Sequence, residues 1–166
     1  MILDVALEDE RWNGFPLADL AQRAVHGVLQ NLELDDQQAE VSILACDDAR
    51  IADLNQEFRE KSSATNVLSW PAQRLAADIP GQDPARPVAD FDGLVPLGDI
   101  AFAYETCRRE ADEAQKPLDE HLTHLIVHGT LHLLGYDHVE DADADLMEGL
   151  ETRILATLGY SDPYVR

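Results

Sequence analysis

Three histidines near residue 130 have the residue type and the spacing of a metal-binding site. His128 and His132 are four residues apart, so on a helix their side chains project from one face, one turn apart. Gly135 can adopt the left-handed conformation that ends a helix, and the chain can then turn back and carry His138 toward the same point. Three imidazoles without a fourth protein ligand are typical of a catalytic zinc site, which keeps one position for water. We therefore expect these three histidines to bind one zinc ion, or another first-row divalent ion.

The other histidines of this region cannot all bind the same ion. His124, His128 and His132 would span roughly 12 Å along a helix axis, whereas Zn–N bonds are only about 2.0–2.1 Å long. Either His124 pairs with His128, or His128 pairs with His132. Only the second pair lies beside the turn that returns His138. His124 is then expected to support the ligands or to pack in the core, and His121 to be a surface or core residue.

Hydrophobic periodicity predicts the elements that must position these side chains. Strands are predicted at 2–8, 39–46, 65–70 and 97–103. Helices are predicted at 17–31, 49–59 after a cap at Asp47 or Asp48, 104–115, 118–134, and from a cap at Asp141 or Asp143 to 158. The helix at 118–134 is largely apolar, which places the metal site at the end of a central, buried helix. The expected fold is α+β (mixed α/β), one domain over 1–166 with a small, roughly four-stranded sheet covered by about five helices.

The segment 72–96 interrupts this pattern with four prolines and two glycines. A structureless segment of this length is usually a functional flap or a mobile insertion. We expect a mobile surface loop, and a lid over the site is the alternative.

The charge of the chain restricts its partners. Thirty-three acidic residues against twelve basic ones give a formal net charge of −21. Such a field repels polyanions, which argues against a nucleic-acid binder held by a broad basic surface. If the substrate is nucleic acid, a few local cations and the metal must attract it. Arg59 is the leading candidate, because a guanidinium can bind a phosphate through two hydrogen bonds. A solvated charge at a helix end is the simpler interpretation of Arg59, and Lys61 is a weaker candidate.

The cysteines and the first residues indicate the compartment. Cys46 and Cys107 are far apart and form no CxxC motif, so we expect two buried, reduced thiols of a cytoplasmic protein. Residues 1–10 lack a basic segment followed by an apolar run, so no signal peptide is expected. No stretch approaches the length of a transmembrane helix, and we expect no membrane partner.

One position separates this motif from that of a protease. The histidine spacing matches the metzincin signature HExxHxxGxxH except at the second position, where Gly129 replaces the general-base glutamate. A metal site could still lower the pKa of a bound water, but peptide hydrolysis by that mechanism requires the carboxylate. Gly129 would instead leave room for a bulky substrate near the metal. The pattern favours a metallohydrolase that is not a protease.

The run HGTLHLLGYDH, from His128 to His138, resembles the signature of the YbeY family, the bacterial endoribonucleases and rRNA maturation factors. Other stretches fit the family in the same order: LNQEFR at 54–59, TNVLSWP at 65–71 and LGDIA at 97–101. Together they cover the chain from roughly residue 40 to 158. Two departures are Asn66, where the family usually has aspartate, and the segment 72–96, which is longer than the family norm.

The resemblance implies a site and a substrate. It implies that His128, His132 and His138 bind a metal, usually zinc, and that Arg59 and His128 are the catalytic residues. The substrate would be single-stranded RNA and not DNA, with work on the 3′ end of small-subunit rRNA and in ribosome quality control.

Three functions are therefore compared. The first is a metal-dependent endoribonuclease. The second is a ribosome-assembly factor with a mainly structural metal, since the charge of −21 favours docking onto basic proteins of the small subunit. The third is a metalloprotease, which Gly129 disfavours.

Overall fold

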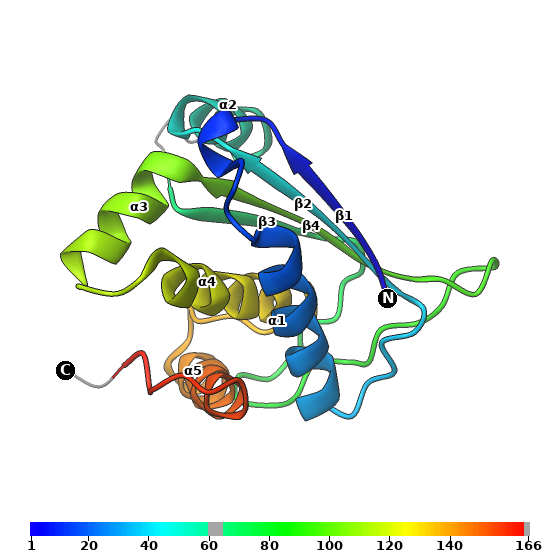
Figure 1. The fold of residues 1–166 in the computed structure, drawn as a ribbon. Helices are drawn as coiled ribbons and strands as arrows, with labels where there is room; N and C mark the ends of the chain where they lie inside the picture. The colour runs from blue at the N-terminus through cyan, green and yellow to red at the C-terminus, as the bar shows by residue number, and fades with distance from the viewer. Residues whose placement is uncertain (60–64, 165–166) are drawn as a thin grey trace.

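A four-stranded mixed sheet forms the middle of the molecule (Figure 1), with strand order β1-β2-β4-β3. The computed structural model describes residues 1–59 and 65–164, without the side chains of residues 58 and 59. The strands β1 (Ile2–Leu7), β2 (Ala39–Cys46) and β4 (Val95–Ala103) are parallel, and β3 (Val67–Pro71) pairs with β4 in the antiparallel sense. All four predicted strands are confirmed. β3 continues through Pro71, where the strand was expected to stop, because an edge strand tolerates a missing backbone N–H.

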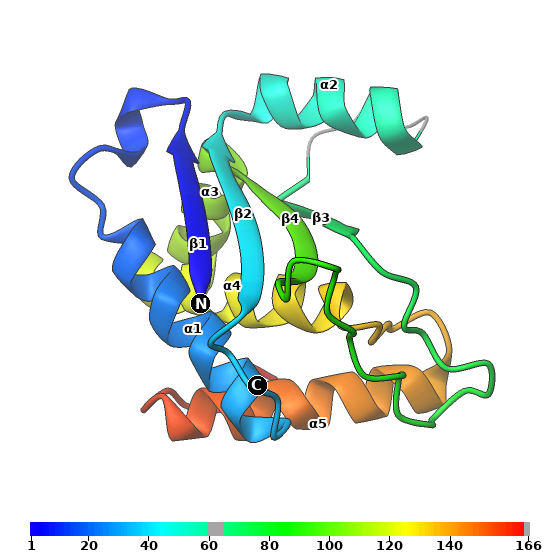
Figure 2. The ribbon, with the colours of Figure 1, turned by 90° about the vertical axis from the view of Figure 1, so that its right-hand side faces the viewer.

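Helices cover the two faces of the sheet unequally. The helices α1 (Leu17–Asn31), α3 (Tyr104–Glu113), α4 (Leu118–Leu133) and α5 (Asp141–Thr157) lie on one face, and α2 (Asp48–Arg59) lies on the other (Figures 1 and 2). A short 3₁₀ helix, η1 (Glu10–Trp12), was not predicted. The described residues thus form one domain with a four-stranded sheet and five α-helices, as expected. In this part of the chain no helix is both long and apolar enough to cross a membrane.

The central position of α4 follows from its composition. It packs against α1, α3, α5, β3 and β4. Its buried side chains include Leu122, Ile126 and Leu131, none of which is exposed to solvent. The strand β2 packs against this helical layer through Val41, Ile43 and Ala45. The residues between them point to the opposite face of the sheet, toward α2. The predicted site helix is therefore anchored by the core on several sides.

The helix starts differ in part from the expectation. Asp47 accepts a hydrogen bond from a backbone N–H in the first turn of α2 at 2.8 Å, so it is the cap of that helix. Neither Asp141 nor Asp143 caps α5, because both lie inside its first turn. There they face the positive end of the helix dipole, which stabilises the helix without a capping bond. Asp143 instead accepts a hydrogen bond from Gly81 N at 2.8 Å.

The long segment between β3 and β4 contains no helix or strand and lies against the start of α5 (Figure 2). Hydrogen bonds within the segment and to α5 help to hold it. Ala85 N donates to Leu75 O at 2.8 Å, the side-chain amide of Gln73 brackets the backbone of Val88, and Gly81 donates to Asp143 of α5. The expected mobility of this loop stays a prediction.

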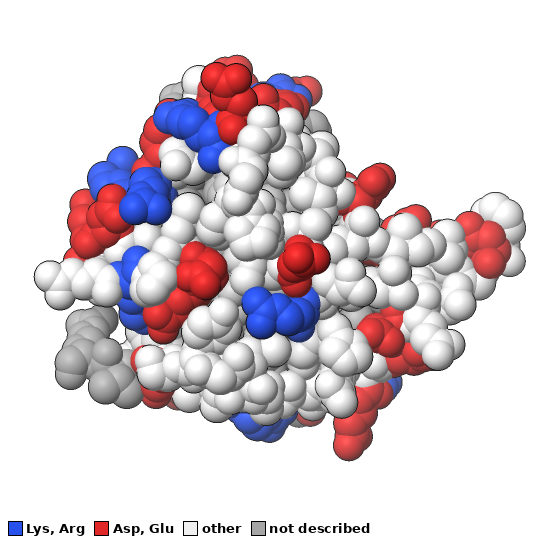
Figure 3. Space-filling model, viewed as in Figure 1, with Lys and Arg blue, Asp and Glu red and all other residues white. Residues whose placement is uncertain are grey.

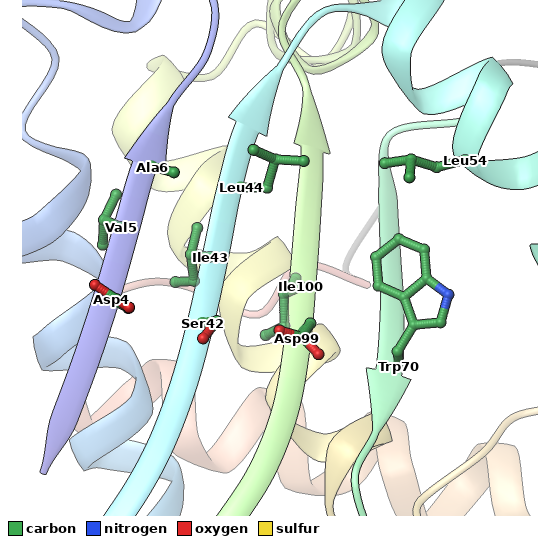
Figure 4. A pocket seen from close by; sticks show the side chains of 10 residues that line it. All are labelled: Asp4, Val5, Ala6, Ser42, Ile43, Leu44, Leu54, Trp70, Asp99 and Ile100. Atoms are coloured by element: carbon green, nitrogen blue, oxygen red, sulfur yellow. The ribbon is translucent and has the colours of Figure 1, made fainter.

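The face of the sheet toward α2 is only partly covered. Asp4, Ser42, Asp99 and Trp70 are cross-strand neighbours and form a row over the four strands (Figure 4). A cavity of about 550 Å³ lies above this row, with Leu54 of α2 at its margin. The sheet separates this cavity from the histidines of α4.

Candidate metal centre

The end of α4 has the turn that the histidine spacing requires. Gly135 has φ +100°, a conformation that L-residues rarely adopt, and the backbone N–H groups of Gly135 and Tyr136 return to the carbonyls of His132 and Leu131. A Cβ on Gly135 would also lie 2.8 Å from the backbone carbon of Leu75. Glycine is therefore required by the conformation and by the loop that passes over the turn.

This turn brings the three predicted ligands together. One ring nitrogen from each of His128, His132 and His138 lies within 4.8 Å of the others. The Nε2 atoms of His128 and His132 are 3.0 Å apart. Ligand nitrogens around a tetrahedral zinc are about 3.3 Å apart, given Zn–N bonds of about 2.0–2.1 Å. The cluster therefore fits one zinc-sized ion after small side-chain adjustments.

In His128 and His132, the ring nitrogen Nδ1 already has a hydrogen-bond partner. His132 Nδ1 lies 3.0 Å from Tyr136 O. Because a carbonyl only accepts, Nδ1 carries the proton and Nε2 keeps a lone pair for a metal. His128 Nδ1 lies 2.9 Å from Glu151 Oε1, which favours the same tautomer. A carboxylate or carbonyl behind a ligating histidine is the usual support of a metal site.

Glu151 of α5 is the main feature of the site that the sequence did not predict. Its side chain is 1% exposed and also lies 2.6 Å from His124 Nε2 and 2.5 Å from the hydroxyl of Tyr164. Burial would raise the pKa of Glu151, but hydrogen bonds from His124, His128 and Tyr164 outweigh it and lower the pKa to about 2. A buried carboxylate therefore holds His124 and His128 in fixed orientations.

A signal for Glu151 does exist in the sequence. It occupies a position of the apolar helical stripe of α5, whose other buried members are Met147, Leu150, Ile154 and Leu155. A charged residue at such a position is rarely buried without partners. Which helix supplies those partners is a tertiary feature.

The electrostatics of His132 suit a ligand. Burial, followed by the neighbouring His128 and His138, lowers the pKa of His132 to about 4. The imidazole is therefore neutral at pH 7, which is the form that binds metals.

The remaining predicted residues have different outcomes. His124 contacts Glu151 as described, and His121 is partly buried with Nε2 3.0 Å from Glu110 Oε1. Arg59 is the last residue of α2, but its side chain, like all of Lys61, lies outside the described residues.

Gly129 does not leave room for substrate, so that expectation was wrong. A Cβ at this position would lie 3.2 Å from Ile100 Cγ2, on the face of α4 that packs against β4. The glycine lets the helix approach the sheet closely, and no side chain at 129 would point into the cleft beside the histidines.

A cleft of about 550 Å³ adjoins the metal cluster. It lies between α3, α4, the residue before β3 and the C-terminal tail, and His128 is part of its wall. The cavity of Figure 4 has a similar volume but lies on the other face of the sheet and contains no histidine. The cleft beside His128 is therefore the candidate substrate site.

On the face seen in Figure 3, Lys and Arg form small separate groups next to Asp and Glu, and they form no continuous basic surface.

Comparisons with known proteins show the family of this chain. The family model described as endoribonuclease YbeY matches residues 5–159. A protein of Ruegeria pomeroyi named endoribonuclease YbeY is 62% identical over 164 residues, which cover 99% of this chain and 98% of the relative. A protein of Cereibacter sphaeroides with the same name is 52% identical, and 98% of both chains is covered. The solution structure of TM1509 from Thermotoga maritima has the same fold, with a TM-score of 0.56 and 19% identity over 99% of this chain and 100% of that one. The match of sequence and fold over nearly the whole length shows that this chain belongs to the YbeY endoribonuclease family.

Proposed function

We propose that the protein is a metal-dependent endoribonuclease that acts on single-stranded RNA. Family membership supports an RNA-hydrolysing enzyme. The observation that carries the metal dependence is the convergence of three imidazole nitrogens, from His128, His132 and His138, within 4.8 Å. A zinc ion bound there would supply a Lewis acid for the phosphodiester and a lowered pKa for an attacking water.

The residues of the chain have distinct roles in this proposal. The three histidines hold the ion, and Glu151 keeps the ring of His128 oriented at 2.9 Å. The cleft beside His128 accommodates the RNA. Arg59 binds the phosphate and stabilises the charge that develops on it. Zinc is the proposed metal because three nitrogen ligands with an open position are typical of it, and other first-row divalent ions would also bind such a set.

The biological substrate is the finer part of the proposal. The names of the relatives say only endoribonuclease. On the resemblance of the motifs, we propose that the substrate is the 3′ end of small-subunit rRNA and that the enzyme serves ribosome quality control. Cys46 and Cys107 are buried and free, which supports a reducing compartment, and we place the enzyme in the cytoplasm.

Basic proteins of the small ribosomal subunit are the proposed protein partners. The net charge of −21 favours such partners. On the open face of the sheet, Asp4 and Asp99 are exposed and have no hydrogen-bond or ion-pair partner among the described residues. Asp99 is the cross-strand neighbour of Trp70, and Asp4 lies in the same row at the other edge of the sheet. Two free carboxylates and an aromatic ring along one row suit an extended basic segment with apolar stems. An assembly factor with a structural metal is the alternative function, and the match to a family of endoribonucleases does not favour it.

A protease is not favoured. The position of its general-base glutamate is Gly129, whose Cβ would face Ile100 of the sheet and not the histidines. No carboxylate at that position could assist the attack of water on a peptide bond.

An RNA cleavage assay tests the proposal. Labelled single-stranded RNA, duplex RNA and single-stranded DNA are incubated with the purified protein, with and without chelator, beside His128→Ala and Arg59→Ala. His26→Ala is the control, because His26 is exposed on α1 and pairs with no described residue other than Asp36. We expect cleavage of single-stranded RNA by the wild type and by His26→Ala, and a loss of at least 100-fold in the other two variants and with chelator. Cleavage that persists with chelator and in His128→Ala would mean that a contaminant is responsible.

The wild type and a further variant with both Asp4 and Asp99 replaced by asparagine test the alternative function. If the wild type cleaves no RNA but binds small-subunit proteins, and Asp4→Asn with Asp99→Asn weakens that binding, the assembly role is correct and the enzymatic role is not.

A further inference from the structure

The cleft beside His128 ends in a hydrogen-bonded group that the proposed reaction does not use. The group consists of Asn66, Glu110 of α3 and His121 of α4. Asn66 Nδ2 donates to Glu110 Oε1 at 2.9 Å, and His121 Nε2 lies 3.0 Å from the same oxygen. The other oxygen, Glu110 Oε2, has no hydrogen-bond partner in the described part of the chain, and the side chain is 34% exposed. That oxygen is free to accept a hydrogen bond from a ligand.

The volume and the lining of the cleft suit a flat heterocycle next to the metal cluster. Its volume of about 550 Å³ lies within the usual range of small-molecule sites, about 300–1,000 Å³. His121 and His128 are two helical turns apart, about 10 Å along the axis of α4. Leu125 lies between them, and the rings of His124 and Tyr164 meet edge to face with centroids 5.7 Å apart. Single-stranded RNA is commonly read by splayed bases that pack on such rings.

The charges of the cleft exclude a phosphate from its far end. Glu110 and Glu113 line it, and no lysine or arginine of the described residues does. A phosphate would be repelled there and attracted to the metal cluster at the other end. A neutral group that donates hydrogen bonds to these carboxylates can bind at this end of the cleft. The Watson–Crick edges of cytosine and adenine present an amino group, which a carboxylate oxygen can bind, whereas uracil presents a carbonyl at the corresponding position.

Asn66 has a defined part in this arrangement. Its Oδ1 accepts from Val67 N at 2.7 Å, which fixes the amide so that Nδ2 points at Glu110. An aspartate at 66 would place a second carboxylate against Glu110 and repel it. Asn66 therefore holds the Glu110 carboxylate in the cleft.

We propose that Glu110, positioned by Asn66 and His121, binds the base of the nucleotide next to the scissile phosphate and selects cytosine or adenine over uracil. This inference rests on the proposed function, because it assumes that the phosphate of an RNA lies at the histidine end of the cleft. It adds to that function a subsite that binds the base and a preference for cytosine or adenine over uracil.

Mononucleotide binding tests the subsite directly. Cytidine monophosphate and uridine monophosphate are titrated into the zinc-loaded protein and followed by calorimetry. We expect the cytidine nucleotide to bind about tenfold more tightly, because a hydrogen bond to a charged acceptor replaces a repulsion between oxygens. In Glu110→Gln the amide can donate to the carbonyl of uracil, so the ratio should fall below about threefold. Asp112→Asn removes an equal charge from an exposed position of α3 outside the cleft, and it should keep the wild-type ratio.

The outcomes distinguish this inference from the proposed function. Equal binding of the two nucleotides by the wild type, no detectable binding of either, or an unchanged ratio in Glu110→Gln would overturn the subsite. RNA cleavage that proceeds equally well at cytidine and uridine tracts would do the same while leaving the endoribonuclease intact. A protein that discriminates the mononucleotides but cleaves no RNA would keep the subsite and reject the nuclease. Thermal unfolding of each variant checks that it is folded.

Discussion

The carboxylate of Glu151 on α5 lies 2.9 Å from Nδ1 of His128 on α4, with 1% of its side chain exposed. The two residues are 23 positions apart in the chain, so this contact exists only after α5 packs on α4. It determines which nitrogen of His128 faces the metal cluster. The geometry of the metal site therefore depends on the packing of two helices as well as on the histidine motif.

Replacing Glu151 should weaken metal binding without removing a ligand. In Glu151→Gln the side chain keeps its shape but loses its charge, and we expect a 10- to 100-fold loss of zinc affinity, the usual effect of changing such a supporting residue. Competition with a chromophoric chelator measures it. Asp145→Asn, an exposed charge change on the same helix, should leave the affinity unchanged. Equal affinity of Glu151→Gln and wild type would show that the contact does not support the ligand.

Gly135→Ala should destabilise the protein more than Gly159→Ala. Both glycines have positive φ, +100° and +92°, so both substitutions strain the backbone by about 1–2 kcal/mol. Only at Gly135 would the new Cβ also collide with the backbone of Leu75 and Ala76. Urea unfolding of the metal-free variants should show an additional loss of about 1 kcal/mol or more for Gly135→Ala. Equal losses would mean that the loop yields freely at this contact.

The stability of the metal-free protein should fall as the pH falls from about 6.5 toward 4. The pKa of His132 is lowered from 6.5 to about 4 in the folded state, so the unfolded state binds more protons in this window. The stabilisation is complete above pH 6.5, and up to about 3 kcal/mol is lost on acidification. Urea unfolding at several pH values checks this. In His132→Gln the slope over this window should be smaller, and an identical slope would contradict the assignment.

Gly129→Glu should not create a protease. The new side chain would run into Ile100 of β4, so we expect a loss of folding stability of more than about 2 kcal/mol and no peptide hydrolysis. Thermal unfolding and a casein digestion assay measure the two effects. A stable, proteolytic variant would show that position 129 faces the metal cluster after all.

Local patterns were enough to predict much of this molecule. The bounds predicted for α1 and β2 agree with the structure because apolar spacing, proline and polar breaks act within a few residues. The convergence of His128, His132 and His138 was predictable for the same reason, since a helix turn and one glycine determine it. Their role as metal ligands stays a proposal.

The predictions that were wrong, and the residue that was not predicted, depend on contacts between elements that are distant in the sequence. Glu151 is brought to His128 by helix packing, and Gly129 faces the sheet because of how α4 sits on β4. The expected cap Asp143 lies inside the first turn of α5 and accepts a hydrogen bond from Gly81, 62 residues earlier. No local pattern encodes such partners.

Metal titration of RNA cleavage tests the central claim most directly. Metal-free protein is loaded with zinc in steps, and bound zinc and the cleavage rate of a single-stranded RNA are measured on the same samples. We predict that the rate rises linearly and stops at one zinc per chain, and that His128→Ala, His132→Ala and His138→Ala each bind zinc at least 100-fold more weakly. Full zinc binding by these variants, or cleavage that is complete before zinc is added, would contradict the claim that the three histidines hold the metal on which catalysis depends.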